Sequence, residues 1–254
     1  MTRRFRSIMF FAGAGAIAFF LLIAFVHLPG PSGLRSRYLQ AINSKAFAQR
    51  NTTDAVTAVN FDYRAFDTLG EEFILFSSVM GALVLLRQAG QKLGTEIRDA
   101  ISPGREVGAG DATRLWILAM VCPKILFGIY IVTHGQLTPG GGFQGGVILA
   151  SAALIIYLGE DFRVFQKIMT RPLIEISEAV GAGLFVVIGL SAMFAGLPLF
   201  TNDLPMGKSH VLTSAGTIPL ISLVTGLEVT AGFVLLLDGF LQETLCRESK
   251  PREP

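Results

Sequence analysis

The residues best placed to do chemistry in this sequence are ionisable side chains set inside long apolar stretches. Lys124 lies at the centre of the stretch 115–132, and Glu228 lies near the centre of the stretch 216–241, with Thr225 one helical turn before it. Charged groups at membrane depth are costly and usually face a partner or a water-filled path. Because Lys124 and Glu228 fall at similar depth, we hypothesise that they pair; the alternative is that each binds a separate partner chain.

Three further ionisable residues stand at the ends of apolar stretches. Glu178 begins the stretch 177–200, Glu71 and its neighbour Glu72 begin the stretch 69–86, and His134 follows the stretch 115–132. Carboxylates in a first helical turn suit the helix dipole, so capping is the simpler interpretation of these acids. His134 can titrate near neutral pH, or it can fix a loop through a hydrogen bond. The candidate ion-path residues are therefore Glu71, Lys124, His134, Glu178 and Glu228.

The remaining residue types form no catalytic constellation. The sequence has only three His and two Cys, without metal-ligand spacing, and no nucleophile–base pair or iron–sulfur ligand pattern can be proposed. A net charge of +2 predicts no nucleic-acid partner. We therefore expect no catalytic residue, no metal and no cofactor, and we do not interpret the chain as an enzyme by itself.

Composition indicates a membrane protein. Of the 254 residues, 51% are apolar and only 16% are charged, against about 25% charged in typical soluble domains. A spanning helix needs roughly 20 mostly apolar residues. Six stretches meet or approach this length: residues 8–28, 69–86, 115–132, 147–158 extended by Phe143 and its preceding glycines, 177–200 and 216–241. The sequence thus predicts an all-α polytopic membrane protein with about six transmembrane helices.

Two features of these stretches need interpretation. The first follows three arginines, so a signal peptide is an alternative, but no A-x-A-like cleavage site follows it and we favour a retained anchor. Lys and Arg set orientation: fourteen fall on the side of both termini and six on the other. Both termini are therefore expected to be cytoplasmic, although five of the six exceptions lie in one segment, residues 35–64.

The chain divides near residue 110 into two regions. Residues 1–110 hold two helices joined by a polar segment, in which we expect a weak helix over 39–50 and an extended stretch over 55–61. Residues 88–101 predict a short amphipathic helix, with Leu93, Ile97 and Ile101 on one face. Residues 111–246 hold four helices, and residues 247–254 form a polar tail.

The most specific string of the sequence joins the third and fourth helices. It reads His134-Gly-Gln-Leu-Thr-Pro-Gly-Gly-Gly-Phe-Gln-Gly-Gly146. No strand precedes it and no Lys-Ser/Thr follows it, which argues against a phosphate-binding loop. Three successive glycines allow backbone geometry closed to other residues, and Gly145 and Gly146 allow close approach of a neighbouring helix. A hairpin that only packs is the alternative interpretation.

This string, with the four helices around it, resembles the MnhB-type (MrpB-type) subunit of the Mrp-type multisubunit cation/proton antiporters. The same domain occurs in related membrane-bound hydrogenases and other complexes with complex-I-like membrane arms. The resemblance covers about residues 115–241, and the string Ser214-Ala215-Gly216-Thr217 is also similar to the family. The motif residues are Gly135, Pro139, Gly140, Gly141, Gly142, Phe143, Gly145 and Gly146.

A second resemblance lies upstream, at Val59-Asn-Phe-Asp-Tyr-Arg-Ala-Phe-Asp-Thr-Leu-Gly-Glu71. It is similar to the C-terminal end of the large, MrpA-type chain of the antiporters, a region that resembles a separate small chain, the E-type subunit, of the membrane-bound hydrogenases. The resemblance favours Glu71 over Glu72 and includes Asp67 and Thr68, with Asp67 as a possible helix cap. Here the two regions are joined in one chain, which departs from the usual division of subunits.

The resemblance implies a non-catalytic membrane subunit of a Na⁺ (or other monovalent cation)/H⁺ antiporter in the inner cell membrane. Implied partners are large proton-pumping subunits, a K-type small subunit, other small hydrophobic subunits and the lipid bilayer. A membrane-arm subunit of a redox complex, such as a membrane-bound hydrogenase, is one alternative. A structural scaffold is another, because resemblance does not settle function.

The orientation is the first testable prediction. A cysteine replacing Thr138, beside the Gly140–Gly142 loop, should react with a membrane-impermeant maleimide added from the outer side, because the Lys and Arg distribution places this loop outside. Labelling of intact cells and of inverted vesicles is the measurement. Reaction from the cytoplasmic side alone would contradict the orientation.

Overall fold

The computed structural model describes residues 3–27, 37–90, 111–160 and 162–248, and every regular element in these ranges is a helix. The chain forms two compact units, Met1–Ser44 and Lys45–Pro254. The first unit holds α1 (Arg3–Val26), whose described side chains from Phe11 onward are all exposed, together with the start of α2 (Arg37–Arg50). The helix expected over residues 39–50 is thereby confirmed.

The second unit contains the helices long and apolar enough to cross a membrane. Five spans are found among the described residues, and α1 adds a shorter apolar stretch, Phe11–Val26. The elements of this unit are α3 (Ala55–Ala58), a π-helical turn η2 (Val59–Tyr63), α4 (Ala65–Gly90), α6 (Asp111–Ala119), α7 (Val121–Thr133), α8 (Gly142–Gly159), α9 (Phe162–Ile168), α10 (Arg171–Phe194) and α11 (Ile218–Glu248). The chain is therefore an all-α polytopic membrane protein.

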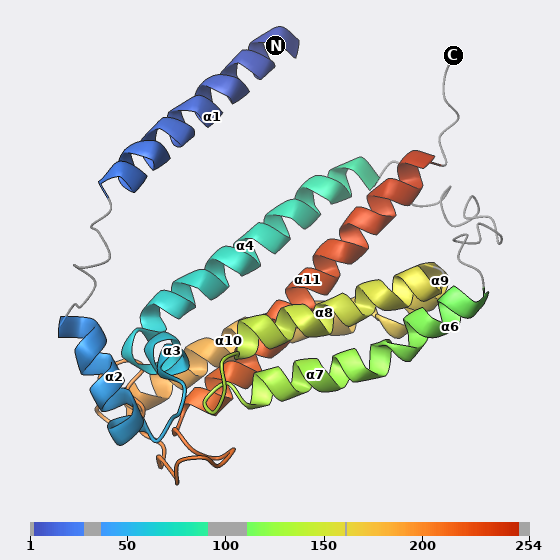
Figure 1. Cartoon of the computed structure of the whole chain (residues 1–254). Coiled ribbons are helices and arrows are strands. Elements are labelled where there is room, and N and C mark those ends of the chain that lie inside the picture. Colours follow the sequence, from blue (N-terminus) through green and yellow to red (C-terminus); the bar gives the residue numbers. More distant parts are fainter. Residues whose placement is uncertain (1–2, 28–36, 91–110, 161, 249–254) are drawn as a thin grey trace, which may run out of the picture. The chain divides into compact units, whose positions relative to one another are not determined.

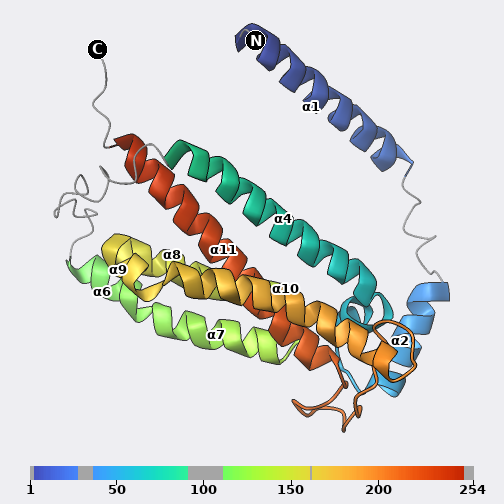
Figure 2. The same ribbon diagram turned by 180° about the vertical axis from the view of Figure 1, so that it is seen from behind.

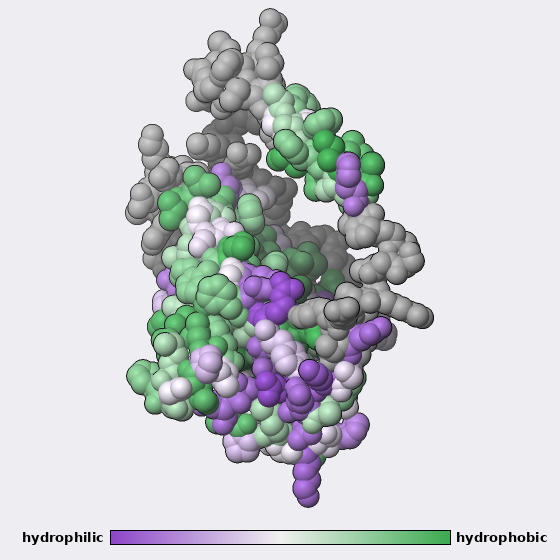
Figure 3. All heavy atoms as spheres, turned by 90° about the vertical axis from the view of Figure 1, so that its left-hand side faces the viewer, coloured by the Kyte–Doolittle hydropathy of each residue, from purple (hydrophilic) through white to green (hydrophobic). Residues whose placement is uncertain are grey.

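Helix α11 is the central element of this unit. It packs against α8, α10 and α4, and α7 packs against α8 and also contacts α11 (Figures 1 and 2). The connections 134–141 and 195–217 and the segment 51–64 meet at one end, which we call the loop end. Outward-facing side chains of the spans, such as Leu126, Val187 and Leu223, are apolar and exposed. Polar residues gather beside an apolar flank in the view from the loop end (Figure 3).

Local sequence explains the break in the third span. The span Arg114–Thr133 is interrupted at Met120, between α6 and α7. Pro123 has no N–H to donate to the Ala119 carbonyl four residues earlier. Met120 instead donates to the carbonyls of Trp116 and Ile117, at 3.2 and 3.1 Å. Pro123 thus lies in the first turn of α7, where proline is tolerated.

Other expectations need correction. Residues 55–61 are not extended, because Asp54 caps α3: its carboxylate accepts from the N–H groups of Val56 and Thr57. Most of the amphipathic helix expected over 88–101 lies outside the described residues. The regions on either side of residue 110 pack as one unit, since α4 contacts α10 and α11. Helix α10 begins at Arg171, six residues before the predicted start.

The glycine-rich loop has the backbone geometry that its composition predicts. Gly140 and Gly141 have φ of 155° and 122°, and Gly141 is the N-cap of α8. Side chains rarely adopt such φ values. Gly142 begins α8, and a Cβ there would lie 2.4 Å from the carbonyl oxygen of Ser222 on α11. The loop therefore places the first turn of α8 in direct contact with α11.

We predict that Gly141→Val lowers the amount of folded protein. A β-branched residue at φ 122° is strained by about 1–3 kcal/mol. The measurement is the melting temperature and yield of the purified membrane protein. Gly183→Val is the matched control, because the Cβ of residue 183 would meet nothing within 4 Å. Equal behaviour of the two variants would contradict a conformational role for Gly141.

Candidate functional site

Three buried glutamates from three helices meet in the middle of the second unit. Glu72 on α4, Glu178 on α10 and Glu228 on α11 are 1%, 2% and 0% exposed. The Glu72 carboxyl group faces that of Glu228 and the hydroxyl of Thr225. Glu228 also interacts electrostatically with Glu178. We call Glu72, Glu178, Glu228 and Thr225 the acid cluster.

Glycines allow the three helices to come this close. A Cβ on Gly181 of α10 would lie 2.7 Å from Cβ of Glu228 and 2.9 Å from its backbone nitrogen. A Cβ on Gly232 of α11 would lie 3.4 Å from Oε1 of Glu178 and 3.3 Å from Cγ2 of Val79 on α4. The absence of side chains at these two positions therefore opens the space that the carboxyl groups occupy.

The polar atoms of the acid cluster have few partners. Both carboxyl oxygens of Glu72 and of Glu228, Oε1 of Glu178 and Oγ1 of Thr225 are buried without a hydrogen bond. The Thr225 methyl group points to α8, since Cγ2 would lie 2.7 Å from a Cβ on Gly142. Among the ion pairs of the described residues none joins the cluster to a basic side chain. Like charges on neighbouring buried carboxyl groups repel, so ionisation of all three at once is unfavourable.

The hypothesised Lys124–Glu228 ion pair does not form in the described structure. Helix α7 meets α11 at other residues: Ser222 Oγ donates to the Val132 carbonyl at 2.7 Å, and a Cβ on Gly226 would lie 2.9 Å from Val132 side-chain carbons. Residues 226 and 228 are about 200° apart around a helix. Glu228 therefore points away from α7, toward α4 and α10.

The other predicted ion-path residues lie in different surroundings. Glu178 is the eighth residue of α10, so capping is the wrong interpretation of this acid; the first turn holds no acid. Glu71 is exposed, whereas Glu72 is the buried member of the pair, which sequence reasoning missed. The signal that could have found Glu72 is a buried stripe at helical spacing: Thr68, Glu72, Val79 and Leu83.

His134 and Asp67 have local structural contacts. His134 Nδ1 lies 3.0 Å from both the Tyr130 carbonyl and Thr133 Oγ1, and its ring stacks on Tyr130. Asp67 lies in the first turn of α4 and pairs with Arg64, so it does not cap that helix. Thr68 donates to the Asn60 carbonyl at 2.6 Å. These contacts fix the helix ends rather than extend the acid cluster.

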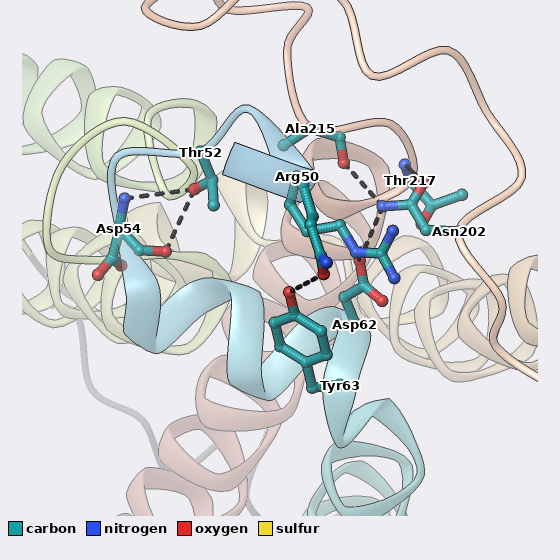
Figure 4. Close-up of polar contacts among 9 residues, drawn as sticks. Arg50, Thr52, Asp54, Asp62, Tyr63, Asn202, Ala215 and Thr217 are labelled. Atoms are coloured by element: carbon teal, nitrogen blue, oxygen red, sulfur yellow. Dashed lines mark hydrogen bonds and ion pairs between the residues drawn. The ribbon is translucent and has the colours of Figure 1, made fainter. Parts of the chain in front are cut away.

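A polar network closes the loop end. Arg50 Nε lies 2.6 Å from Oδ2 of Asp62, and Asn202 Nδ2 donates to the same oxygen at 3.1 Å (Figure 4). Asn202 also donates to the Ala215 carbonyl and accepts from the Thr217 N–H, at 3.0 and 2.9 Å. Burial raises the pKa of the Asp62 carboxyl, and the Asn202 hydrogen bond and the Arg50 charge oppose that rise. The network ties α2, η2 and the loop before α11 together.

The opposite end has a second set of charges. Arg171 Nε lies 2.8 Å from Glu175 Oε1, and its Nη1 lies 3.7 Å from Oδ2 of Asp238. Gln242 Nε2 donates to Asp238 Oδ2 at 2.7 Å. No group of three His, Cys, Asp or Glu side chains in the described ranges is placed to hold a metal ion. The Arg171–Asp238 contact joins the start of α10 to α11 at the end opposite the loops.

The close contact at Gly181 generates a prediction. Gly181→Ala should destabilise the protein by about 1–3 kcal/mol, because the new methyl group overlaps the backbone of Glu228. Gly183→Ala, two residues along the same helix, should cost little because its Cβ is in open space. Thermal melting of the two variants is the measurement. Similar melting temperatures would contradict the assigned α10–α11 contact.

Comparison with known proteins identifies relatives of the chain. The family described as "Domain related to MnhB subunit of Na+/H+ antiporter" matches residues 113–235. An uncharacterised protein of Methanocaldococcus jannaschii is 30% identical over 70% of this chain and 72% of its own length. Putative antiporter subunit mnhB2 of Staphylococcus saprophyticus is 34% identical over 35% of this chain and 67% of its own. A probable K⁺/H⁺ antiporter chain of Rhizobium meliloti, named for a combined A/B subunit, is 24% identical over 87% of this chain, which spans only 23% of that relative.

Solved structures share the fold. A chain of the membrane-bound sulfane sulfur reductase, an archaeal respiratory membrane complex, aligns with a TM-score of 0.62 and 24% identity over 93% of this chain and 98% of that one. The Mrp complex from Dietzia sp. DQ12-45-1b aligns with a TM-score of 0.68 and 20% identity over 100% of this chain and 27% of that one. The family match over residues 113–235 and the Staphylococcus relative, 34% identical with 67% of its length covered, show that the chain belongs to the family of domains related to the MnhB subunit of Na⁺/H⁺ antiporters.

Proposed function

We propose that this chain is a membrane subunit of an Mrp-type monovalent cation/proton antiporter, contributing to both the ion path and assembly. Family membership and the Rhizobium relative, named as a combined A/B antiporter chain, support this assignment. The observation that carries a role in the ion path is Glu228, which is fully buried between Glu72 and Glu178 and forms no ion pair with any basic side chain that the structure describes. A scaffold needs no such group, because a buried charge without a partner is destabilising.

The chain then works with other subunits in the inner cell membrane. The partners that the family implies are large proton-pumping subunits and small hydrophobic subunits. Exposed apolar side chains on every span provide surfaces for lipid or for such partners. A redox complex is the second candidate, because the fold of the sulfane sulfur reductase chain matches nearly its whole length. Identification of the co-purifying chains separates the two: iron–sulfur subunits would favour the redox complex.

Neutralising the central acid tests the proposed role. We expect Glu228→Gln to lower cation/proton exchange at least tenfold while the amount of assembled complex stays near wild type, since Gln is nearly isosteric but cannot carry the proton. Exchange is measured by dye-reported pH changes in inverted vesicles after a cation pulse. Asp203→Asn, on the exposed loop before α11, is the matched control and should be silent. Full exchange activity in Glu228→Gln would favour the scaffold function.

A further inference from the structure

Mostly apolar side chains lie between the acid cluster and the loop end. Ile218 and Ile221 in the first turn of α11 are 0% and 2% exposed. Ala65 and Phe61 are also buried, and the Phe61 ring packs against Gly141 of the glycine loop. The hydroxyl group of Thr68, one turn before Glu72, is buried in the same layer and donates to the Asn60 carbonyl. Beyond this layer the Arg50–Asp62–Asn202 network holds the loop end together.

Charged side chains of α10 lie between the acid cluster and the end opposite the loops. Glu175 lies one turn before Glu178 on the same helix and interacts with it electrostatically. Its side chain is 49% exposed and pairs with Arg171, at the start of α10. The distance along α10 from Glu178 to Arg171 is about 10 Å, at 1.5 Å per residue. Beside this route Val79, Leu83 and Leu235 form an apolar cluster that closes the α4–α11 contact.

Glu71 connects the acid cluster laterally to the outer face of α4. Glu71 adjoins Glu72 in the sequence and interacts with it electrostatically, yet the Glu71 side chain is exposed on the outer face of α4. Asp67 and Ser78 lie on the same face of this helix, at spacings of i−4 and i+7. An ionisable group on the lipid face of a span is costly. This face therefore fits a protein partner that presents a polar group, not lipid tails.

We propose that the acid cluster is a one-sided proton path, which opens at Glu175 and leaves the chain laterally through Glu71 into a partner protein. The inference rests on the proposed function and deepens it, because it assigns protons and a route to this chain. Each step moves one proton from a carboxylic acid to a neighbouring carboxylate, in the order Glu175, Glu178, Glu228, Glu72 and Glu71. The unbonded oxygens of Glu72, Glu228 and Thr225 are the groups that a bridging water would serve. The partner supplies a His, Lys or carboxyl side chain that takes the proton from Glu71.

Substitutions at exposed acids test the lateral exit. In the purified complex reconstituted in vesicles, Glu71→Gln should lower exchange at least tenfold, and Glu71→Asp should recover part of it because a proton carrier is restored. Asp111→Asn, at an exposed acid that begins α6, is the control and should leave exchange within twofold of wild type. A path that crosses the loop end predicts the reverse: Glu71→Gln would be silent and Asp62→Asn would abolish exchange. That pattern overturns the proposal.

A second measurement leaves every acid in place. Ile74, one turn after Glu71 and 68% exposed, is replaced by the photo-crosslinker benzoylphenylalanine. Irradiation of the native membrane should join this chain to another protein of the complex, and adducts to lipid alone would overturn the lateral exit. The Glu228 and Glu71 variants distinguish failure of the proposed antiporter function from failure of the lateral proton route. If Glu228→Gln blocks exchange while Glu71→Gln does not, the antiporter function stands and the lateral route is wrong; if neither affects exchange, both are wrong.

Discussion

The contact of α4, α10 and α11 around three buried carboxyl groups determines how the second unit packs. Carboxyl groups without a base must be protonated or solvated to lie inside a membrane protein. The structure brings Glu72, Glu178 and Glu228 together and gives them no ion-pair partner among the described residues. A purely structural interface would gain from apolar residues at these positions, since polar groups buried without hydrogen bonds cost about 1–3 kcal/mol each. The cost is consistent with a functional requirement for the acids.

Close helix packing makes this arrangement possible. Gly181 and Gly232 open space at the cluster, while Gly142 and Gly146 let α8 pack directly on the opposite side of α11. Helix association within a membrane relies on such close backbone contacts, because apolar side chains gain little by leaving lipid. The glycine loop supports the same contact, since Gly141 adopts a φ of 122° at the start of α8. Thus the most specific motif of the sequence positions α11 through its contact with α8.

Much of the fold could be predicted from the sequence, and the failures have physical causes. Apolar length identified the five spans that the described residues form. Glu228 could be identified as a central buried acid from depth alone. Its partner could not, because a helix turns about 100° per residue and the face of α11 that meets α7 is set by tertiary packing. Glu71 and Glu72 illustrate the same limit: the two are adjacent in the sequence, and only the packing of α4 decides which one is buried.

The carboxyl groups of the acid cluster lie at different heights along α11. The cluster spreads along α11, from Thr225 beside Glu72 to Gly232 beside Glu178, which is about 10 Å at 1.5 Å per residue. A line of carboxyl groups at different heights suits stepwise proton transfer, because each group can hold a proton without the others being ionised at once. This arrangement along α11 supports the proton path proposed for this chain.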